Sequence, residues 1–239
     1  MSLPVSLSMP TLPVTRGGAA QPLVEGLLLQ RRESAAPLAG RDTAAAGPQI
    51  VAASRLIGAA GTDVDAGAVV VDLDIDPDDL AGAIEHRPVR FHVHVTAEQV
   101  DDAVSLRLPA PVAVFVTPAA DHPAGLAEAA QTLSVAGHCP GLVAGVPADA
   151  VADFLAVLAH TSVGFVAQAR DGAEVLALLA GTVAALRGDD VRAALAHPDT
   201  AALAALNPDA AEAVRGVLLG IEVESPEQVE QVLADAGLL

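Results

Sequence analysis

The chain has 239 residues, a formal net charge of −18 and 52% hydrophobic residues, which is a globular composition with enough apolar material for a substantial core. Its acidic balance argues against nucleic acid or an anionic membrane as a partner, because both require a basic face. The sequence contains no Lys, which excludes a Schiff-base nucleophile, a pyridoxal phosphate anchor and a phosphate-loop lysine.

Cysteine usage and the N-terminus indicate a cytoplasmic protein. Cys139 is the only cysteine, so the chain cannot form an internal disulfide, and nothing indicates an oxidising compartment. The first residues lack a basic region and are interrupted by prolines, which is unlike a signal peptide. No apolar run is long enough to span a membrane. We expect a cytoplasmic chain with no membrane partner.

The N-terminal third is the least regular part of the sequence. Residues 1–20 are rich in Pro and Gly and predict an extended arm before one α/β domain over 21–239. The apolar run at 23–29 is a possible first strand, and the small and polar residues 30–48 predict a loop. Residues 49–61 suit either a strand running into a helix or one helix, because periodicity cannot decide between them over so short a run.

Two runs between residues 68 and 95 show strict alternation, which is the signature of a strand. In the first run, Asp72, Asp74 and Asp76 alternate with apolar residues. In the second, RFHVHV, His92 and His94 do the same. The apolar residues of both runs, which we expect to lie under helices, are Val69, Val71, Leu73, Ile75, Phe91, Val93 and Val95.

Strand and helix alternate from here to the C-terminus. Further strands are predicted at 111–118, 132–137, 141–146, 162–169 and 216–223, with helices between them and two or three short helices over 189–216. Connectors of this length favour parallel pairing with right-handed crossovers. Eight strands in all predict an α/β fold of the (β/α)8 TIM-barrel type. A doubly wound open parallel sheet is the alternative, although no Gly-rich turn follows the first strand.

In such a barrel the polar residues of the alternating strands point inward, where unpaired charge is costly. The simplest register places Asp72 beside Arg90, Asp74 beside His92 and Asp76 beside His94. One interpretation is a divalent metal site built from Asp74, Asp76, His92 and His94, the residue types that bind such ions. Another is a structural ladder of ion pairs that binds nothing. A third makes the two strands antiparallel, with their polar side in water.

Other polar residues fall at predicted strand ends, where the sites of barrel enzymes form. His138 precedes Cys139 at one of them, Gln168 and Arg170 follow another, and Glu222 ends the last strand. We expect His94, Asp76, His138 and Glu222 to carry acid–base chemistry. Arg170 and Gln168 are expected to bind substrate.

These features predict an enzyme acting on a small polar molecule as a lyase, isomerase or hydrolase, with or without a divalent metal. The alternative is a non-catalytic binding or scaffold protein with a degenerate barrel, favoured by the Ala-rich helices and the absence of a strong motif. Those helices could also form a homo-oligomer interface.

Overall fold

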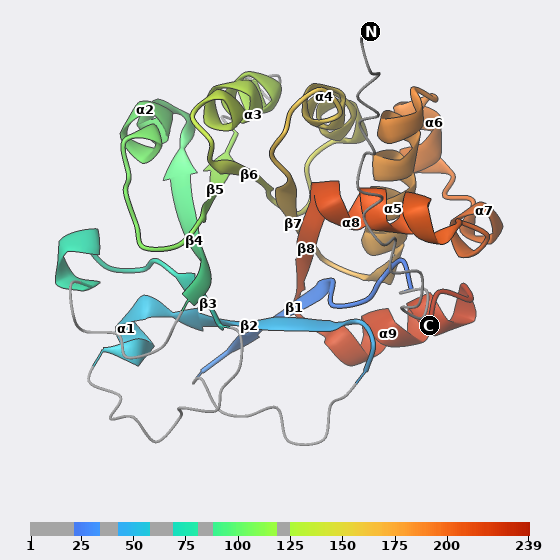
Figure 1. Cartoon of the computed structure of the whole chain (residues 1–239), viewed down its shortest axis with the longest axis horizontal. Helices are drawn as coiled ribbons and strands as arrows, with labels where there is room; N and C mark the ends of the chain where they lie inside the picture. The colour runs from blue at the N-terminus through green and yellow to red at the C-terminus, as the bar shows by residue number, and fades with distance from the viewer. Residues whose placement is uncertain (1–21, 34–42, 58–68, 81–87, 119–124) are drawn as a thin grey trace, which may run out of the picture.

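In the computed structural model the chain forms a closed barrel of eight parallel strands that follow one another around the barrel in sequence order. Figure 1 shows the helices arranged outside the strands. The structure describes residues 22–33, 43–57, 69–80, 88–118 and 125–239, so the predicted arm at 1–20 lies outside it. The predicted (β/α)8 barrel is confirmed, and the open sheet and the antiparallel pairing are both wrong.

The strands are short, and β1 pairs with both β2 and β8, which closes the barrel. They are β1 (Leu28–Arg32), β2 (Ala46–Ala52), β3 (Val69–Asp72), β4 (Pro88–Thr96), β5 (Val112–Thr117), β6 (Cys139–Leu142), β7 (Phe165–Ala169) and β8 (Leu218–Val223). Because all are parallel, their carboxyl ends meet at one end of the barrel, which we call the mouth.

Helices and 3-10 turns fill the connections between the strands. They are α1 (Ala53–Leu56), η1 (Pro77–Leu80), η2 (Ala97–Gln99), α2 (Val100–Val104), α3 (Gly125–Val135), α4 (Ala148–Leu158), α5 (Gly172–Arg187), α6 (Val191–Ala196), α7 (Thr200–Ala204), α8 (Pro208–Val217) and α9 (Pro226–Asp235). Asp171 caps the start of α5 by accepting a hydrogen bond from the Glu174 amide, and Gly188 ends this helix with a φ of 73°. None of the described helices is both long and apolar enough to cross a membrane.

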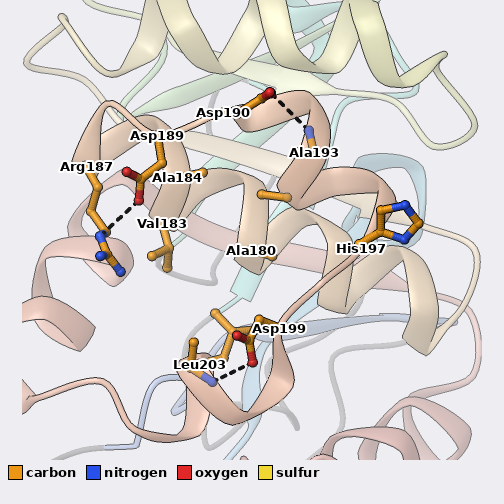
Figure 2. Close-up of a pocket in the computed structure, with 12 residues that line it drawn as sticks. Ala180, Val183, Ala184, Arg187, Asp189, Asp190, Ala193, His197, Asp199 and Leu203 are labelled. Carbon is orange, nitrogen blue, oxygen red and sulfur yellow. Dashed lines mark hydrogen bonds and ion pairs between the residues drawn. The ribbon is translucent and has the colours of Figure 1, made fainter.

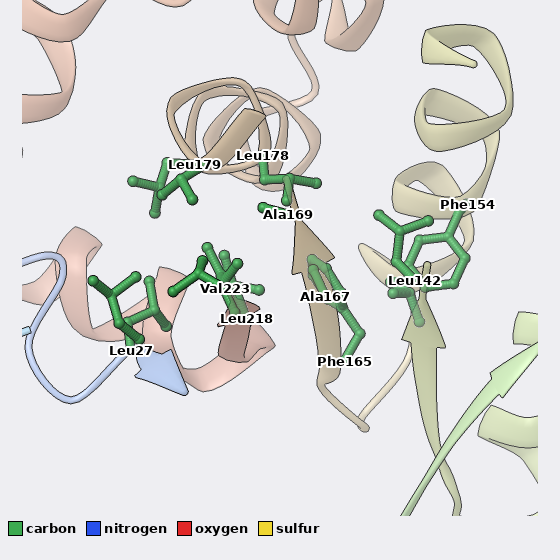
Figure 3. Packing of buried hydrophobic residues seen from close by; sticks show 14 of the residues in the cluster. Leu27, Leu142, Phe154, Phe165, Ala167, Ala169, Leu178, Leu179, Leu218 and Val223 are labelled. Atoms are coloured by element: carbon green, nitrogen blue, oxygen red, sulfur yellow. The ribbon is translucent and has the colours of Figure 1, made fainter. Parts of the chain in front are cut away.

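The main core lies between the barrel wall and the helices. Figure 3 shows this layer where side chains of β6, β7 and β8 meet those of α4 and α5. Phe154 of α4 and Phe165 of β7 contact each other edge to face, with ring centroids 5.5 Å apart. The outward-facing residues of β3 and β4, including Val71 and Phe91, belong to the same core, as their alternation predicts.

A second, smaller core fills the inside of the barrel. Its members are Leu29, Ile50, Val70, Ala113, Phe115, Cys139 and Val166. Two glycines make room for the larger side chains. A Cβ atom at Gly141 would lie 2.5 Å from the Phe115 ring, and one at Gly220 would lie 2.8 Å from the Leu29 side chain. The barrel is therefore packed below its mouth, as is usual for this fold.

The eight strands are not all where the sequence predicts them. The strand expected at 132–137 is wrong, because α3 continues to Val135 and β6 begins only at Cys139. The eighth strand is instead β2. For residues 49–61 the structure thus has the alternative in which a strand runs into a helix, and β2 begins inside the predicted loop at 30–48. That loop also contains the end of β1, because β1 continues past the apolar run to Arg32.

Candidate active site

The mouth is lined by polar residues on the inner faces of the strands. The rings of His92 and His94 both lie within 5.1 Å of the Phe115 ring in the barrel interior, so these histidines point inward as predicted. Asp72 is the last residue of β3 and is paired with His92. The predicted register with Asp72 beside Arg90 is therefore wrong by two residues, and a shift between Val69 and Val70 accounts for one of them.

Arg31 joins two carboxylates across the mouth. Its Nη1 donates to Asp72 Oδ2, while its Nε and Nη2 donate to Glu222 Oε1 at 3.1 and 2.8 Å. Glu222 also accepts from Gln168 Nε2 at 3.2 Å through its other oxygen. The guanidinium thus links β1 to β3 and β8, and both carboxylates are held in fixed positions by charge-assisted hydrogen bonds.

His94 lies on the other side of Asp72. Its Nε2 is 3.4 Å from Asp72 Oδ1, which is longer than an ordinary hydrogen bond. Oδ1 has no hydrogen-bond partner among the described residues. The imidazole is stacked on Phe115 at 4.9 Å with an interplanar angle of 14°, so the ring is held in place by packing. A contact of this length is typical of acid–base pairs that tighten only when substrate is bound.

Asp72 and Arg31 are both charged at neutral pH. Burial raises the pKa of the Asp72 carboxyl, but the close contact with His94, the hydrogen bond from Arg31 and the charge of Arg31 outweigh that effect and lower its pKa to about 2. Burial also lowers the pKa of Arg31, while its contacts with Asp72 and Glu222 raise it above the ordinary value. Asp72 is therefore a carboxylate beside an imidazole, which is the arrangement that directs a general base.

A cavity of about 230 Å³ opens beside this cluster, over the ends of β1, β7 and β8. Arg31, Gln168, Arg170 and Glu222 line it, together with Glu224. Both residues predicted to bind substrate therefore lie at the mouth, with the Glu222 carboxylate between them and Arg31.

Glu174 holds Arg170 at the edge of this cavity. Its carboxylate accepts from the Arg170 amide at 2.8 Å, from Arg170 Nε at 3.1 Å and from the Gly145 amide at 2.9 Å. This one side chain therefore ties the β6–α4 loop to the start of α5 and orients the guanidinium.

No family model, curated protein or solved structure matches this chain. The chemistry of the mouth therefore has to be inferred from its own side chains.

The four residues predicted to bind a metal do not come together. β3 ends at Asp72, so the next two acidic residues lie beyond the strand. Asp74 is exposed and accepts hydrogen bonds from the Ser54 amide, at 2.8 Å, and from the Ser54 hydroxyl. Asp76 is exposed where η1 begins. Across the part of the chain that the structure describes, no group of three or more His, Cys, Asp and Glu side chains is arranged to hold a metal ion.

His92 lies below the mouth and is fully buried. Neither ring nitrogen has a hydrogen-bond partner within the described ranges. Burial lowers the pKa of this imidazole, and the positive charge of Arg90 lowers it further, to about 3. His92 is therefore a neutral ring in the floor of the site, out of reach of a substrate.

His138 lies at the opposite end of the barrel from the mouth. It precedes β6, which begins at Cys139, and its Nε2 is 3.1 Å from the Val104 carbonyl oxygen. The sequence reasoning placed His138 at the end of a strand that does not exist. Its neighbour Cys139 is buried in the barrel, and burial raises the pKa of the thiol to about 12, so it is not a nucleophile at neutral pH.

A second cavity, larger than the one at the mouth, lies outside the barrel between α5, α6 and α7 and measures about 400 Å³. Figure 2 shows an alanine-rich wall with charged residues around it. Arg187 is paired with Asp189 at 3.2 Å, and Asp190 and Asp199 cap the two short helices. These charges already have partners within the fold, so we place the candidate active site at the mouth, where the smaller cavity adjoins the Arg31–Asp72–His94 cluster.

Sequence reasoning missed two residues of the mouth. The sequence pattern predicts that Asp72 points inward but favours Asp74 and Asp76 for the site, and it places Arg31 in a loop. The available signal was the alternation of Leu29 and Arg31 in the run LLLQRR, which continues the inner face of the first strand.

Proposed function

We propose that this chain is a cytoplasmic enzyme whose barrel mouth carries out acid–base chemistry on a small polar molecule, as a lyase, isomerase or hydrolase. One observation carries the proposal. The buried Asp72 carboxylate lies between Arg31 and His94, with its Oδ1 oxygen directed at no other hydrogen-bond donor of the described chain. A structural ion pair needs only Arg31, whereas the open side of Asp72 faces His94, a histidine that is accessible at the mouth.

His94 is the general base and acid of the proposed reaction. A proton on Nε2, directed at Asp72 Oδ1, leaves the lone pair on Nδ1. His94 is 40% exposed, so a bound molecule can reach the ring. Asp72 is a positioning residue that selects the tautomer and stabilises the imidazolium formed when Nδ1 takes a proton.

Glu222, Gln168 and Arg170 bind and orient the substrate in this proposal. Arg31 and Gln168 occupy both oxygens of Glu222, which fixes the carboxylate at the cavity wall as an acceptor for a hydroxyl or ammonium group. The cavity of about 230 Å³ suits a molecule smaller than a drug-sized ligand.

The experiment is a conversion screen read by proton NMR. The purified full-length protein is incubated in deuterated buffer with a panel of small hydroxy acids, amino acids, sugars and amides. New signals or loss of a carbon-bound proton signal report a lyase, isomerase or hydrolase reaction alike. The same panel is given to His94→Gln, to Asp72→Asn and to His197→Gln, an exposed histidine outside the mouth.

The proposal predicts a conversion that His94→Gln abolishes, that Asp72→Asn slows by about 10²- to 10⁴-fold, and that His197→Gln leaves unchanged. All four proteins should unfold cooperatively. If every conversion found is equally fast in His94→Gln, the mouth is not an acid–base site. If Asp72→Asn and His94→Gln only lower the melting temperature and no panel member is converted, the cluster is the structural ladder of a non-catalytic barrel.

A further inference from the structure

Two charged groups facing the mouth cavity are not fully used by the fold. Arg170 donates to Glu174 through Nε alone, and no other acceptor in the described chain contacts its guanidinium. Glu224 follows β8, lines the same cavity and makes no hydrogen bond or ion pair with a described residue. By contrast, Arg31 and Glu222 are paired with each other and with further partners.

The open edge of Arg170 is shaped for a carboxylate. Its two terminal nitrogens can donate in parallel to both oxygens of one carboxylate group. The guanidinium also lies against Gly145, because a Cβ atom there would be 3.7 Å from Arg170 Cζ. The Arg170 side chain is 69% exposed, so a ligand can reach this edge while Glu174 holds Nε.

The charges that line the cavity are balanced. Its lining has two cationic residues, Arg31 and Arg170, and two acidic ones, Glu222 and Glu224. Arg31 is paired with Glu222, which leaves Glu224 and the open edge of Arg170 for a ligand. Glu224 and the fixed Glu222 carboxylate would both accept hydrogen bonds from an ammonium group. A simple anion would engage only the open edge of Arg170 and a simple cation only the carboxylates, whereas a molecule with both groups engages both.

Resting on the acid–base function proposed above, we propose that the substrate is a small zwitterion of the amino-acid class, with its carboxylate on Arg170 and its ammonium group on Glu224. Such a molecule matches the open edge of Arg170 and the carboxylate of Glu224 at once, and it fits a cavity of about 230 Å³. Its central carbon would then lie between the two charged groups, in the cavity that Glu222 and Arg31 border.

The test is equilibrium binding by calorimetry, supported by the shift in melting temperature, and it needs no turnover. The probes are the twenty common amino acids, β-alanine and 4-aminobutyrate, each at up to about 10 mM, the weak end of measurable affinity. Propionate and ethylamine are the matched probes that lack the ammonium group and the carboxylate. Arg170→Gln and Glu224→Gln are compared with Arg192→Gln and Glu212→Gln, which alter exposed charges on α6 and α8.

We expect at least one zwitterion to bind saturably and at least tenfold more tightly than propionate or ethylamine. Arg170→Gln and Glu224→Gln should each weaken that binding at least tenfold, and the two control variants should bind as the wild type does. His94→Gln should bind the zwitterion as the wild type does even where it abolishes turnover. The binding result can therefore be interpreted even if the catalytic proposal fails. Binding of propionate as tight as that of every zwitterion, or no saturable zwitterion binding, overturns the proposal.

Discussion

Replacing His92 with Leu should remove much of the sensitivity of the barrel to mild acid. His92 is fully buried, and no described residue forms a hydrogen bond with either ring nitrogen. Burial and the nearby charge of Arg90 lower the pKa of the imidazole to about 3 in the folded chain, whereas it is about 6.5 in an unfolded chain. Between these two values the unfolded chain binds a proton that the folded barrel excludes.

The size of the effect follows from these two pKa values. Because the folded pKa lies below the unfolded one, the stabilisation is complete above pH 6.5 and is lost progressively as the pH falls toward 3. Within this window the free energy of unfolding falls by about 1.4 kcal/mol per pH unit. From pH 7 to pH 5, His92 alone should cost the wild type about 2 kcal/mol. The lowered pKa values of Asp72 and Asp74 act below 3.8, outside this interval.

The assay is urea unfolding at pH 7 and at pH 5. The drop in unfolding free energy between the two should be about 2 kcal/mol smaller in His92→Leu than in the wild type. His160→Gln, which alters an exposed histidine after α4, should show the full wild-type drop. Equal drops in the wild type and in His92→Leu would refute the reasoning, because His92 would then be protonated to the same degree in both states.

Three further predictions concern the fold around the site. Asp72→Asn should lower the free energy of unfolding by about 1–2 kcal/mol at pH 7 after allowance for solvent screening. Because the folded pKa of Asp72 is lowered to about 2, this loss of stability should shrink as the pH falls below 3.8. A loss that stays constant with pH would contradict the lowered pKa. Cys139 should resist a thiol reagent in the native protein and react once urea unfolds it, because burial raises its pKa to about 12; rapid native labelling would show that the interior is open. Gly141→Ala should cost about 1–3 kcal/mol in urea unfolding through its clash with Phe115. Gly216→Ala, where a Cβ atom meets nothing within 4 Å, should gain about 0.5–1 kcal/mol, and equal effects of the two changes would argue against the packed interior.

The barrel could be predicted from the sequence because its strands carry a period that their packing requires. The alternation around Val71 and Phe91 places apolar side chains under the helices and polar ones inside, and the structure has them so. The ends of the strands are harder to predict from the sequence. TLSVAG is apolar enough for a strand, but the chain there completes the last turns of α3, since Leu133 is buried as part of that helix.

The composition of the site depended on where two strands stop. β3 ends at Asp72, so Asp74 and Asp76 leave the barrel wall although the sequence pattern continues through them. β1 continues to Arg32, so Arg31 enters the mouth although its segment reads as a loop. Alternation fixes which face a residue occupies while the strand lasts, but it does not show where hydrogen bonding to the neighbouring strand ends. Glu222 could be predicted because β8 extends one residue past it, to Val223, where the predicted strand also ends.

In the proposed reaction, Asp72 holds His94 as a base whose free lone pair is on Nδ1. A long-range proton–nitrogen NMR spectrum of the histidine rings reports the tautomer of the neutral ring directly. The wild type should show His94 protonated on Nε2 and unprotonated on Nδ1, and Asp72→Asn should shift the ring to a mixture of tautomers. The exposed control Asp101→Asn, on α2, should leave the spectrum unchanged. A His94 ring with the same tautomers in the wild type and in Asp72→Asn would contradict the account.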